Sequence, residues 1–416
     1  MTPLDPAALR RRFPALARRG EGGRPVVYAD APGGSQVPLT VIDAIAGHLR
    51  SGISNTHGAF AASEETDALI ADARRAAADV TGADPGEIVF GPNSTTLLLH
   101  LSRSFGRTLR PGDEVVVTTL DHDANVRPWV LAAEDAGATV RWVDIRDDDV
   151  TLDLDSFDAA LSDRTRLVAF TLASNAVGTV PPAAELIERI HAAGALAAVD
   201  GVHVAQHRAL DLHASGADIM ACSPYKFFGP HLGVLSVRRE LLETWTPYKL
   251  RPAPDDAPDR WETGTQNHEG LAGLIAAVDY LADVGRTYGS PDGGTRRDAV
   301  VAGFGAIGTH ERELAARFLR GVAGIPEVRL WGIADEARLD ERTPTFAVRV
   351  GDQDPLKTAS ELARRGIYVW DGHYYAITVM ERLGLLDSGG AVRIGFCHYH
   401  STEDVDRVLG ALAELA

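Results

Sequence analysis

Between residues 85 and 240, short apolar runs alternate with stretches of helical length, and this alternation restricts the fold more than any other feature. The runs with strand character are 87–90, 114–119, 139–144, 166–173, 196–200, 218–222 and 234–237. The stretches with helical periodicity between them include 95–105, 124–136 and 183–193. Several runs are apolar throughout, which is typical of strands covered on both faces. The pattern predicts an α/β fold with a mostly parallel seven-stranded sheet sandwiched by helices.

A smaller α+β region is expected after the sheet. Long helices are predicted at 269–284 and 298–322, and the segment 401–415 closes the chain as a helix that Ser401 can cap. The strand-like runs of this region are 328–331, 345–350, 367–370 and 392–398. A chain of 416 residues suits two domains better than one core. We therefore expect a large domain at 22–285 and a small domain made of 1–21 and 286–416.

Composition excludes several classes of function. The net charge of −17 argues against binding to nucleic acid. No run of about 18 apolar residues predicts a membrane span, and the N-terminal stretch lacks the apolar segment of a secretory signal. Only two cysteines occur, Cys222 and Cys397, and no Cys/His cluster has the spacing of a metal site. We expect a cytoplasmic protein without a structural disulfide or a metal.

Lysine is rare, which draws attention to each lysine present. The 41 basic residues include only Lys226, Lys249 and Lys357, and the others are arginine. Arginine cannot form an imine, because its guanidinium stays protonated. Lys226 lies in Ser223-Pro-Tyr-Lys226, directly after a predicted strand. A lysine at that position is held by a rigid scaffold and partly desolvated, which favours the neutral amine.

Polar residues follow four other predicted strands. Asp200 ends one strand, where a buried acid needs a partner such as a pyridinium nitrogen. The stretch Pro92–Thr96 opens a helix and suits a phosphate group, although simple helix capping is the favoured interpretation of this stretch taken alone. His122 and Asn175 also follow strands. Because ligands bind at the carboxyl ends of strands in such sheets, the convergence of these residues with Lys226 predicts one site.

The quoted segments resemble the class V aminotransferase group of fold type I enzymes that depend on pyridoxal 5'-phosphate (PLP), with cysteine desulfurases and selenocysteine lyases the nearest in pattern. The similar stretches run in the same order as in that group: Val-Tyr28-Ala-Asp30, Asn93-Ser-Thr95, Asp121-His122, Ser174-Asn175-Ala-Val-Gly178-Thr179, Val-Asp200-Gly201, Ser223-Pro-Tyr-Lys226, Gly264-Thr265 and Val392-Arg393. The resemblance implies the PLP-dependent transferase fold type I and PLP as cofactor.

The resemblance also implies roles for single residues. Lys226 forms the aldimine with PLP and moves the Cα proton, Asp200 pairs with the pyridinium nitrogen, and His122 stacks on the ring. The implied contacts to the cofactor's oxygens and phosphate come from Asn175, His203, Ser94, Thr95, Ser223, Tyr225 and, in the partner subunit, Thr265. The implied contacts to an amino-acid substrate come from Arg393, Asn55, His373 and Tyr375. A homodimer with active sites shared between subunits follows from the role of Thr265.

Four positions depart from the family pattern. His203 stands where the family commonly has glutamine, and Tyr225 where it commonly has histidine. A desulfurase also needs a loop cysteine as sulfur acceptor, and the matching segment, Trp370-Asp-Gly-His-Tyr-Tyr-Ala376, has Tyr375 at that position. Trp370 takes the place of an arginine usual at the start of the loop. A tyrosine cannot form a persulfide, so the usual route of sulfur transfer is not expected.

The two cysteines do not replace the missing thiol. Cys397 is expected in the last strand, on the same face as Arg393 if residues alternate, and its interpretation as a buried structural cysteine is favoured. Cys222 lies in an apolar strand and is expected in the core.

Chemistry that begins with loss of the Cα proton therefore remains. C–S β-elimination from cysteine or an S-substituted cysteine is the first choice, because it needs no acceptor thiol. A class V aminotransferase and an amino-acid epimerase, with His373, Tyr374 or Tyr375 as a second acid, are the alternatives. A non-catalytic PLP-fold protein is disfavoured by the pair of Lys226 and Asp200, and a dinucleotide-binding oxidoreductase by the absence of Gly-x-Gly-x-x-Gly after the early strands.

Overall fold

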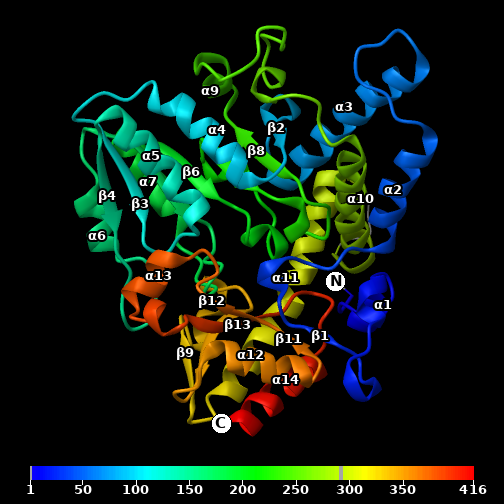
Figure 1. Cartoon of the computed structure of the whole chain (residues 1–416), viewed down its shortest axis with the longest axis vertical. Coiled ribbons are helices and arrows are strands. Elements are labelled where there is room, and N and C mark those ends of the chain that lie inside the picture. The colour runs from blue at the N-terminus through cyan, green and yellow to red at the C-terminus, as the bar shows by residue number, and fades with distance from the viewer. Residues whose placement is uncertain (1, 290–293) are drawn as a thin grey trace.

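A seven-stranded sheet forms the centre of the larger part of the molecule (Figure 1). The computed structural model describes residues 2–289 and 294–416. The strands lie in the order β2-β8-β7-β6-β5-β3-β4, and only β8 runs antiparallel to its neighbours. Their bounds are β2 Ile88–Gly91, β3 Glu114–Thr118, β4 Thr139–Val143, β5 Thr165–Thr171, β6 Leu196–Asp200, β7 Ile219–Cys222 and β8 Gly233–Val237. The predicted α/β fold with a mostly parallel sheet is confirmed.

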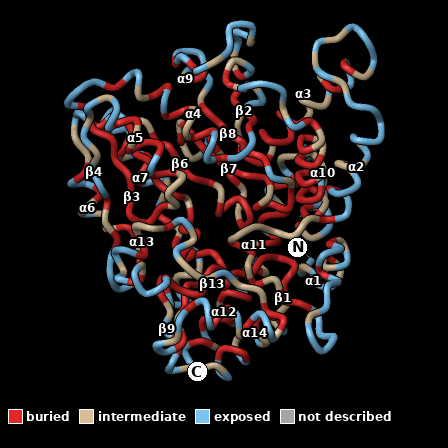
Figure 2. The backbone as a smooth tube through the Cα atoms, in the orientation of Figure 1, coloured by how far each residue is buried: buried red, intermediate tan, exposed pale blue. Residues whose placement is uncertain are grey.

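Except at the edge strand β4, both faces of this sheet are buried, which explains why several of its strands are mostly apolar (Figure 2). Successive side chains of β3 enter opposite cores: Val115 and Val117 join one cluster and Val116 joins the other. One cluster is built with α4 (Ser94–Gly106), α5 (Arg127–Ala136) and α9 (Arg239–Thr244). The other is built with α3 (Ala61–Thr81), α6 (Leu154–Ala160), α7 (Ala183–Ala192), α8 (Leu212–Ser215) and α10 (His268–Val284).

The smaller part of the molecule contains an antiparallel sheet in the order β12-β13-β10-β9 (Figure 1). These strands are β9 Val328–Trp331, β10 Thr345–Val350, β12 Trp370–Gly372 and β13 Ala391–Gly395. Their apolar faces pack with α11 (Arg296–Val322), α12 (Pro355–Arg364) and α14 (Thr402–Leu415) in a separate core. Ser401 and Asp404 form the capping box that begins α14, as the sequence indicates.

The N-terminal segment crosses between the two parts. It contains α1 (Pro6–Arg10), β1 (Val27–Tyr28) and α2 (Leu39–Ser51). β1 pairs in parallel with β11 (Ile367–Tyr368), so residues assigned to the large domain contact an element of the small one. The predicted domain boundaries stay predictions. In the described part of the chain, no helix combines the length and apolar character needed to cross a membrane.

Two predicted strands differ from the structure. The run 367–370 was expected as one strand, but it divides between β11, which pairs with β1, and β12, which pairs with β13. The run 392–398 was also expected as one strand, but β13 ends at Gly395. A short run of apolar residues does not specify which strand it pairs with, and here one run divides between two different partner strands. The remaining helix, α13 (Ile377–Arg382), follows β12.

Candidate active site

Three neighbouring parallel strands, β5, β6 and β7, bring their carboxyl ends to one edge of the sheet. In register, Thr171 lies opposite Asp200, and Asp200 lies opposite Ala221 on β7. Four residues beyond β7, Lys226 closes a short 3-10 turn, and its Nζ donates a hydrogen bond to the carbonyl of Pro32. The fold therefore positions the lysine and the acid beside each other through rigid elements.

The Lys226 amine is buried and surrounded by ionisable groups. Its pKa is lowered from 10.5 to about 7, first because burial disfavours the ammonium and second because Arg393 lies nearby. Asp200 and Asp30 act in the opposite direction and keep the pKa from falling further. Near neutral pH a substantial fraction of this lysine is thus the free amine, the form that reacts with a carbonyl carbon and accepts a proton.

Two buried carboxyl groups lie behind the lysine. Burial raises the pKa of Asp200 to about 6, and its Oδ1 accepts a hydrogen bond of 2.7 Å from the backbone N–H of Val202. Burial also raises the pKa of Asp121 to about 8, and the like charge of Asp200 adds to this shift. Asp121 accepts a hydrogen bond of 2.7 Å from Asn125. Since a cation would offset the cost of burial, Asp200 is a suitable partner for a positively charged heterocycle.

His122 follows Asp121 and presents an uncharged ring. Burial and, to a smaller extent, the charges of Lys226 and Arg393 together lower its pKa to about 3. Its Nδ1 accepts a hydrogen bond of 3.0 Å from the backbone of Ala124. The ring stacks on Tyr375, with 5.4 Å between centroids and 13° between planes. A neutral imidazole with a free face can stack on an aromatic cofactor.

Several buried polar atoms around Lys226 fit the oxygen-rich periphery of PLP. Within the described residues no hydrogen-bond partner exists for the Ser223 Oγ, the Asn175 Oδ1 or the His203 Nδ1. Buried polar atoms are rarely left unpaired, so their concentration here indicates a place for a polar ligand. The N-terminus of α4 begins at Ser94 and lies against the start of β8, where a side chain in place of Gly233 would meet the Ser94 nitrogen. Such a helix start suits a phosphate.

The other predicted phosphate ligands lie in different settings. Ser94 is buried, whereas Thr95 is exposed on the first turn of α4. The Tyr225 ring stacks on His231 with 4.9 Å between centroids, and burial raises its pKa. Asn55 and Thr265 are exposed on the segments before α3 and α10. Their predicted roles in substrate and cofactor binding stay predictions.

Arg393 on β13 approaches the site from the small domain. It is buried, and its pKa is lowered to about 10 because burial disfavours the cation. Its Nη1 donates a hydrogen bond of 3.0 Å to the carbonyl of Asn175, and its guanidinium lies 4.5 Å from the centre of the Tyr374 ring. Among the described residues its Nε has no partner. The group is thus oriented but not saturated, as a carboxylate-binding arginine requires.

The segment 370–376 closes over the same residues. The Tyr374 carbonyl accepts a hydrogen bond of 2.9 Å from the Asn175 amide, and the Tyr375 carbonyl accepts one of 2.7 Å from the backbone of Asp123. Tyr374 and Tyr375 have φ of 52° and 58°, a region that non-glycine residues rarely adopt. Tyr375 and His373 remain exposed. The segment is therefore attached to the site by its backbone while the side chains of His373 and Tyr375 stay accessible.

Both cysteines are buried, as the sequence predicts, but the predicted environment of Cys397 is wrong. It lies two residues beyond the end of β13, so the alternation that would align it with Arg393 does not apply. Its sulfur is 3.7 Å from the Nδ1 of His400, and burial raises the pKa of its thiol well above the ordinary value. Burial also raises the pKa of Cys222. Neither cysteine is a ready thiolate.

Sequence reasoning gave no role to Asp30, which the structure brings to the site. Burial raises its pKa to about 6, while Arg393 and Lys226 lower it. Its Oδ1 is buried and has no partner in the described part of the chain. Asp30 belongs to the segment Val-Tyr28-Ala-Asp30, which resembles the family pattern, but that resemblance alone gives Asp30 no role.

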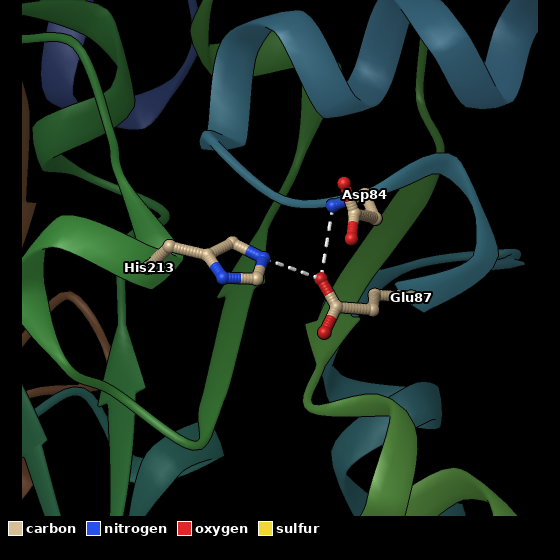
Figure 3. A group of neighbouring side chains, drawn as sticks. All are labelled: Asp84, Glu87 and His213. Carbon is tan, nitrogen blue, oxygen red and sulfur yellow. Dashed lines mark hydrogen bonds and ion pairs between the residues drawn. The ribbon is translucent and has the colours of Figure 1, made fainter.

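A group of three potential metal ligands lies apart from these residues, beside the turn that precedes β2 (Figure 3): Asp84, Glu87 and His213. Glu87 Oε2 accepts a hydrogen bond of 2.9 Å from the Asp84 backbone and lies 2.7 Å from the His213 Nε2. Glu87 is thereby already engaged in linking the turn before β2 to α8. The sequence prediction that the chain holds no metal stays a prediction.

Comparison with known proteins identifies relatives along the whole chain. The family described as aminotransferase class V matches residues 27–288 and 300–408. A probable cysteine desulfurase 2 of Mycobacterium leprae is 34% identical over 99% of this chain and 97% of its own length. A cysteine desulfurase of Dickeya dadantii is 31% identical over 99% of this chain and 96% of its own length.

Solved structures give the same result. A cysteine desulfurase of Thermococcus onnurineus in its apo form superposes with a TM-score of 0.88 and 27% identity, over 100% of this chain and 99% of the other. A cysteine desulfurase of Escherichia coli superposes with a TM-score of 0.82 and 27% identity, over 99% of both chains. The predicted resemblance and the predicted fold type are confirmed.

Proposed function

The chain belongs to the class V aminotransferase family of PLP-dependent enzymes, and from that premise we propose that it cleaves the C–S bond of cysteine or an S-substituted cysteine by β-elimination. The observation that carries the proposal is the buried Lys226, whose pKa of about 7 makes its amine available near neutral pH. The cofactor, when bound, supplies a protonated pyridine ring that takes up the electron pair left at Cα.

The proposed role of each site residue follows from its position. Lys226 holds the cofactor and then accepts the Cα proton at Nζ. Asp200 keeps the ring nitrogen protonated, and its raised pKa falls again once that cation is beside it. Arg393 binds the substrate carboxylate through the side of its guanidinium that Asn175 and Tyr374 do not occupy. His122 covers one face of the ring and, with its pKa of about 3, adds no charge.

The fate of the sulfur follows from the chain's lack of an accessible thiol. Tyr375 occupies the loop position where a sulfur acceptor is expected, and both cysteines are buried with raised pKa values. We therefore propose that the sulfur leaves directly as a thiol or as sulfide after gaining a proton. The remaining carbon skeleton, 2-aminoacrylate, is hydrolysed to pyruvate and ammonia, so atoms balance without a persulfide.

The test is an assay of pyruvate and sulfide with cysteine, cystine and cysteine S-conjugates. Pyruvate formed without an added keto acid supports elimination. Lys226→Ala should lose both the visible band of the cofactor and turnover, and Cys397→Ser should lose neither. Amino transfer to an added keto acid would instead assign an aminotransferase. Loss of sulfide production in Cys397→Ser with the cofactor still bound would show that the buried thiol takes part.

We also propose that the enzyme is a homodimer. Apolar side chains along α2 and just after it are exposed: Leu39, Ile42, Leu49 and Ile53. The spacing of Leu39, Ile42 and Leu49 puts these three side chains on one face of α2, and a contiguous apolar face of this kind favours a protein partner. A second copy fits the role implied for Thr265. Light scattering should give twice the mass of 44.4 kDa, and Ile42→Glu with Leu49→Glu should halve it.

A further inference from the structure

His203 connects the candidate site to a second set of buried polar groups. It lies three residues after Asp200 and is almost completely buried. Its Nε2 is 3.2 Å from the hydroxyl of Thr343 and 3.1 Å from that of Thr345. Lys226 and Arg393 both lower its pKa, which means that the ring is within electrostatic reach of the site.

The His203 ring has the properties of a proton carrier. Burial lowers its pKa well below the ordinary value, so the ring is neutral near pH 7. A neutral imidazole carries one N–H and one lone pair and can accept a proton at one nitrogen while releasing one at the other. Its Nδ1 is buried and, across the described residues, has no partner in the protein. The family's usual glutamine cannot pass a proton in this way.

A pocket of about 240 Å³ lies on the far side of Thr343 and opens to solvent beside the exposed residues Arg312 and Asp340. Thr343, His207 and Glu311 line it. His207 Nδ1 is 2.7 Å from Glu311 Oε2, and both side chains are almost completely buried. Among the residues described, His207 Nε2 and Glu311 Oε1 have no partner. A polar pocket of this size with free donors and acceptors is suited to ordered water.

The Thr343 hydroxyl is the link between pocket and ring. Its single proton has two acceptors within reach, the Gly178 carbonyl at 3.4 Å and the His203 Nε2 at 3.2 Å. The His203 and His207 rings also approach edge to face, with 5.1 Å between centroids. Thr345 bonds to the same nitrogen of His203 but is absent from the pocket lining within the described chain.

We infer that Thr343 and His203 form a proton path from this water-holding pocket to the cofactor site, with the His207–Glu311 pair as its buffer at the pocket end. The inference rests on the proposed site around Lys226. The path would let the buried groups of that site, Lys226 and Asp200, exchange protons with solvent.

Each step moves one proton and leaves each group as it began. Pocket water that has taken up a proton from solvent gives it to the Thr343 oxygen as the Thr343 O–H gives its own to His203 Nε2. His203 Nδ1 then releases a proton toward the site, and the ring and the hydroxyl reorient to restore the first arrangement. The reverse sequence carries a proton out. No charge accumulates on His203, which its burial between Lys226 and Arg393 would disfavour.

Charged side chains line the pocket and favour the exchange of protons between the pocket and solvent. Arg208, Arg312 and Arg342 line it together with Asp340. Burial raises the pKa of Glu311, whereas the nearby His207 and His310 lower it. From the segment after β13, the backbone of His398 also lowers the pKa of Glu311.

The test follows the visible band of the bound cofactor in the holoenzyme after a rapid change of pH, without substrate. Thr343→Val, which removes the hydroxyl at nearly constant volume, and His207→Gln should slow relaxation of the band by about tenfold or more. Thr343→Ser should relax like the wild type. Thr345→Val is the matched control, because it removes a hydroxyl on the same nitrogen outside the pocket and should leave the rate unchanged. Thermal melting reports whether each variant folds.

The outcomes separate the inference from its premise. If folded Thr343→Val or His207→Gln relaxes at the wild-type rate, or if Thr345→Val is slowed equally, the path is wrong while the cofactor site stands. If the wild-type protein with added PLP has no visible band, the cofactor site on Lys226 fails and the path fails with it. Elimination activity is not needed for the measurement, so failure of the proposed reaction alone leaves the result readable.

Discussion

The strand-end cluster around Lys226 and the segment 370–376 meet at one site but differ in burial, in backbone conformation and in the contacts that hold them. The cluster comes from three parallel strands and is buried, with Lys226 only 7% exposed. In the segment, Tyr375 is 65% exposed, and both it and Tyr374 adopt positive φ. The cluster is held by the core, whereas the segment is held by hydrogen bonds: it pairs with β13 at its start, and its carbonyls at Tyr374 and Tyr375 accept hydrogen bonds from Asn175 and Asp123.

This difference indicates how one fold can support several reactions. The rigid edge of the sheet supplies what every reaction of the family needs, an amine and an acid in fixed relation. Under the proposed function, the segment, whose backbone is strained and whose His373 and Tyr375 side chains are accessible, decides what happens after the proton has left Cα. Substitutions in the cluster should therefore abolish chemistry, and substitutions in the segment should redirect or modulate it.

The largest effect is expected for Asp200→Asn. The amide cannot keep the ring nitrogen of the cofactor protonated, so kcat should fall by about 10³-fold while the cofactor still attaches to Lys226. The measurement is pyruvate formation together with the absorbance spectrum. Asp218→Asn is the matched control, because Asp218 precedes β7 at the opposite edge of the sheet and bonds to His191. An equal loss of activity in both variants would mean that the effect is not specific to the edge of the sheet that carries Asp200.

Arg393→Lys comes next, because Arg393 belongs to the strand scaffold yet touches the segment through Tyr374. A lysine keeps the charge but loses the paired hydrogen bonds to a carboxylate, so kcat/KM should fall roughly 10- to 100-fold, chiefly through KM. Arg349→Lys on the neighbouring strand is the control, since Arg349 binds the carbonyls of Ser388 and Gly390. A loss confined to kcat would mean that Arg393 does not bind substrate.

The sequence was a good guide to the rigid half of this comparison and a poor one to the other. Six of the seven strands were predictable because both faces of the sheet are buried there, which leaves apolar runs; the edge strand β4 is largely exposed. Asp200 and Lys226 could be assigned to one edge because parallel strands align their ends. The environment of Cys397 was not predictable, since alternation holds only while a strand lasts and β13 ends at Gly395. The His207–Glu311 contact joins elements 104 positions apart and has no local signal.

A third prediction concerns stability in the cofactor-free protein. The pKa of Lys226 is about 7 in the folded chain, whereas 10.5 is the ordinary value of a solvated lysine, which applies to the unfolded chain. Between these values the unfolded state binds more protons, so the free energy of unfolding rises with pH across this window. Below about pH 7 the penalty for burying the amine is complete, and above about pH 10.5 it is absent.

Urea denaturation of wild type and Lys226→Met, after cofactor removal, isolates this contribution. The free energy of unfolding of the wild type minus that of the variant should rise by a few kcal/mol between about pH 7 and pH 10.5. The other titrating groups cancel in this difference. A difference that is flat with pH would mean that the amine is not desolvated in the folded chain. The cluster would then lack the property that makes Lys226 reactive.

The smallest effect tests the strained backbone of the segment. Tyr375→Gly and Tyr375→Ala both remove the ring that stacks on His122, but only glycine adopts a φ of 58° without steric cost. The glycine variant should therefore be more stable than the alanine variant by about 1 kcal/mol in urea denaturation. Position 376 follows the strained residues and is buried, so there the wild-type alanine should be more stable than Ala376→Gly. If alanine is favoured at both positions, the segment carries no stored strain, and its contrast with the cluster reduces to a difference in exposure.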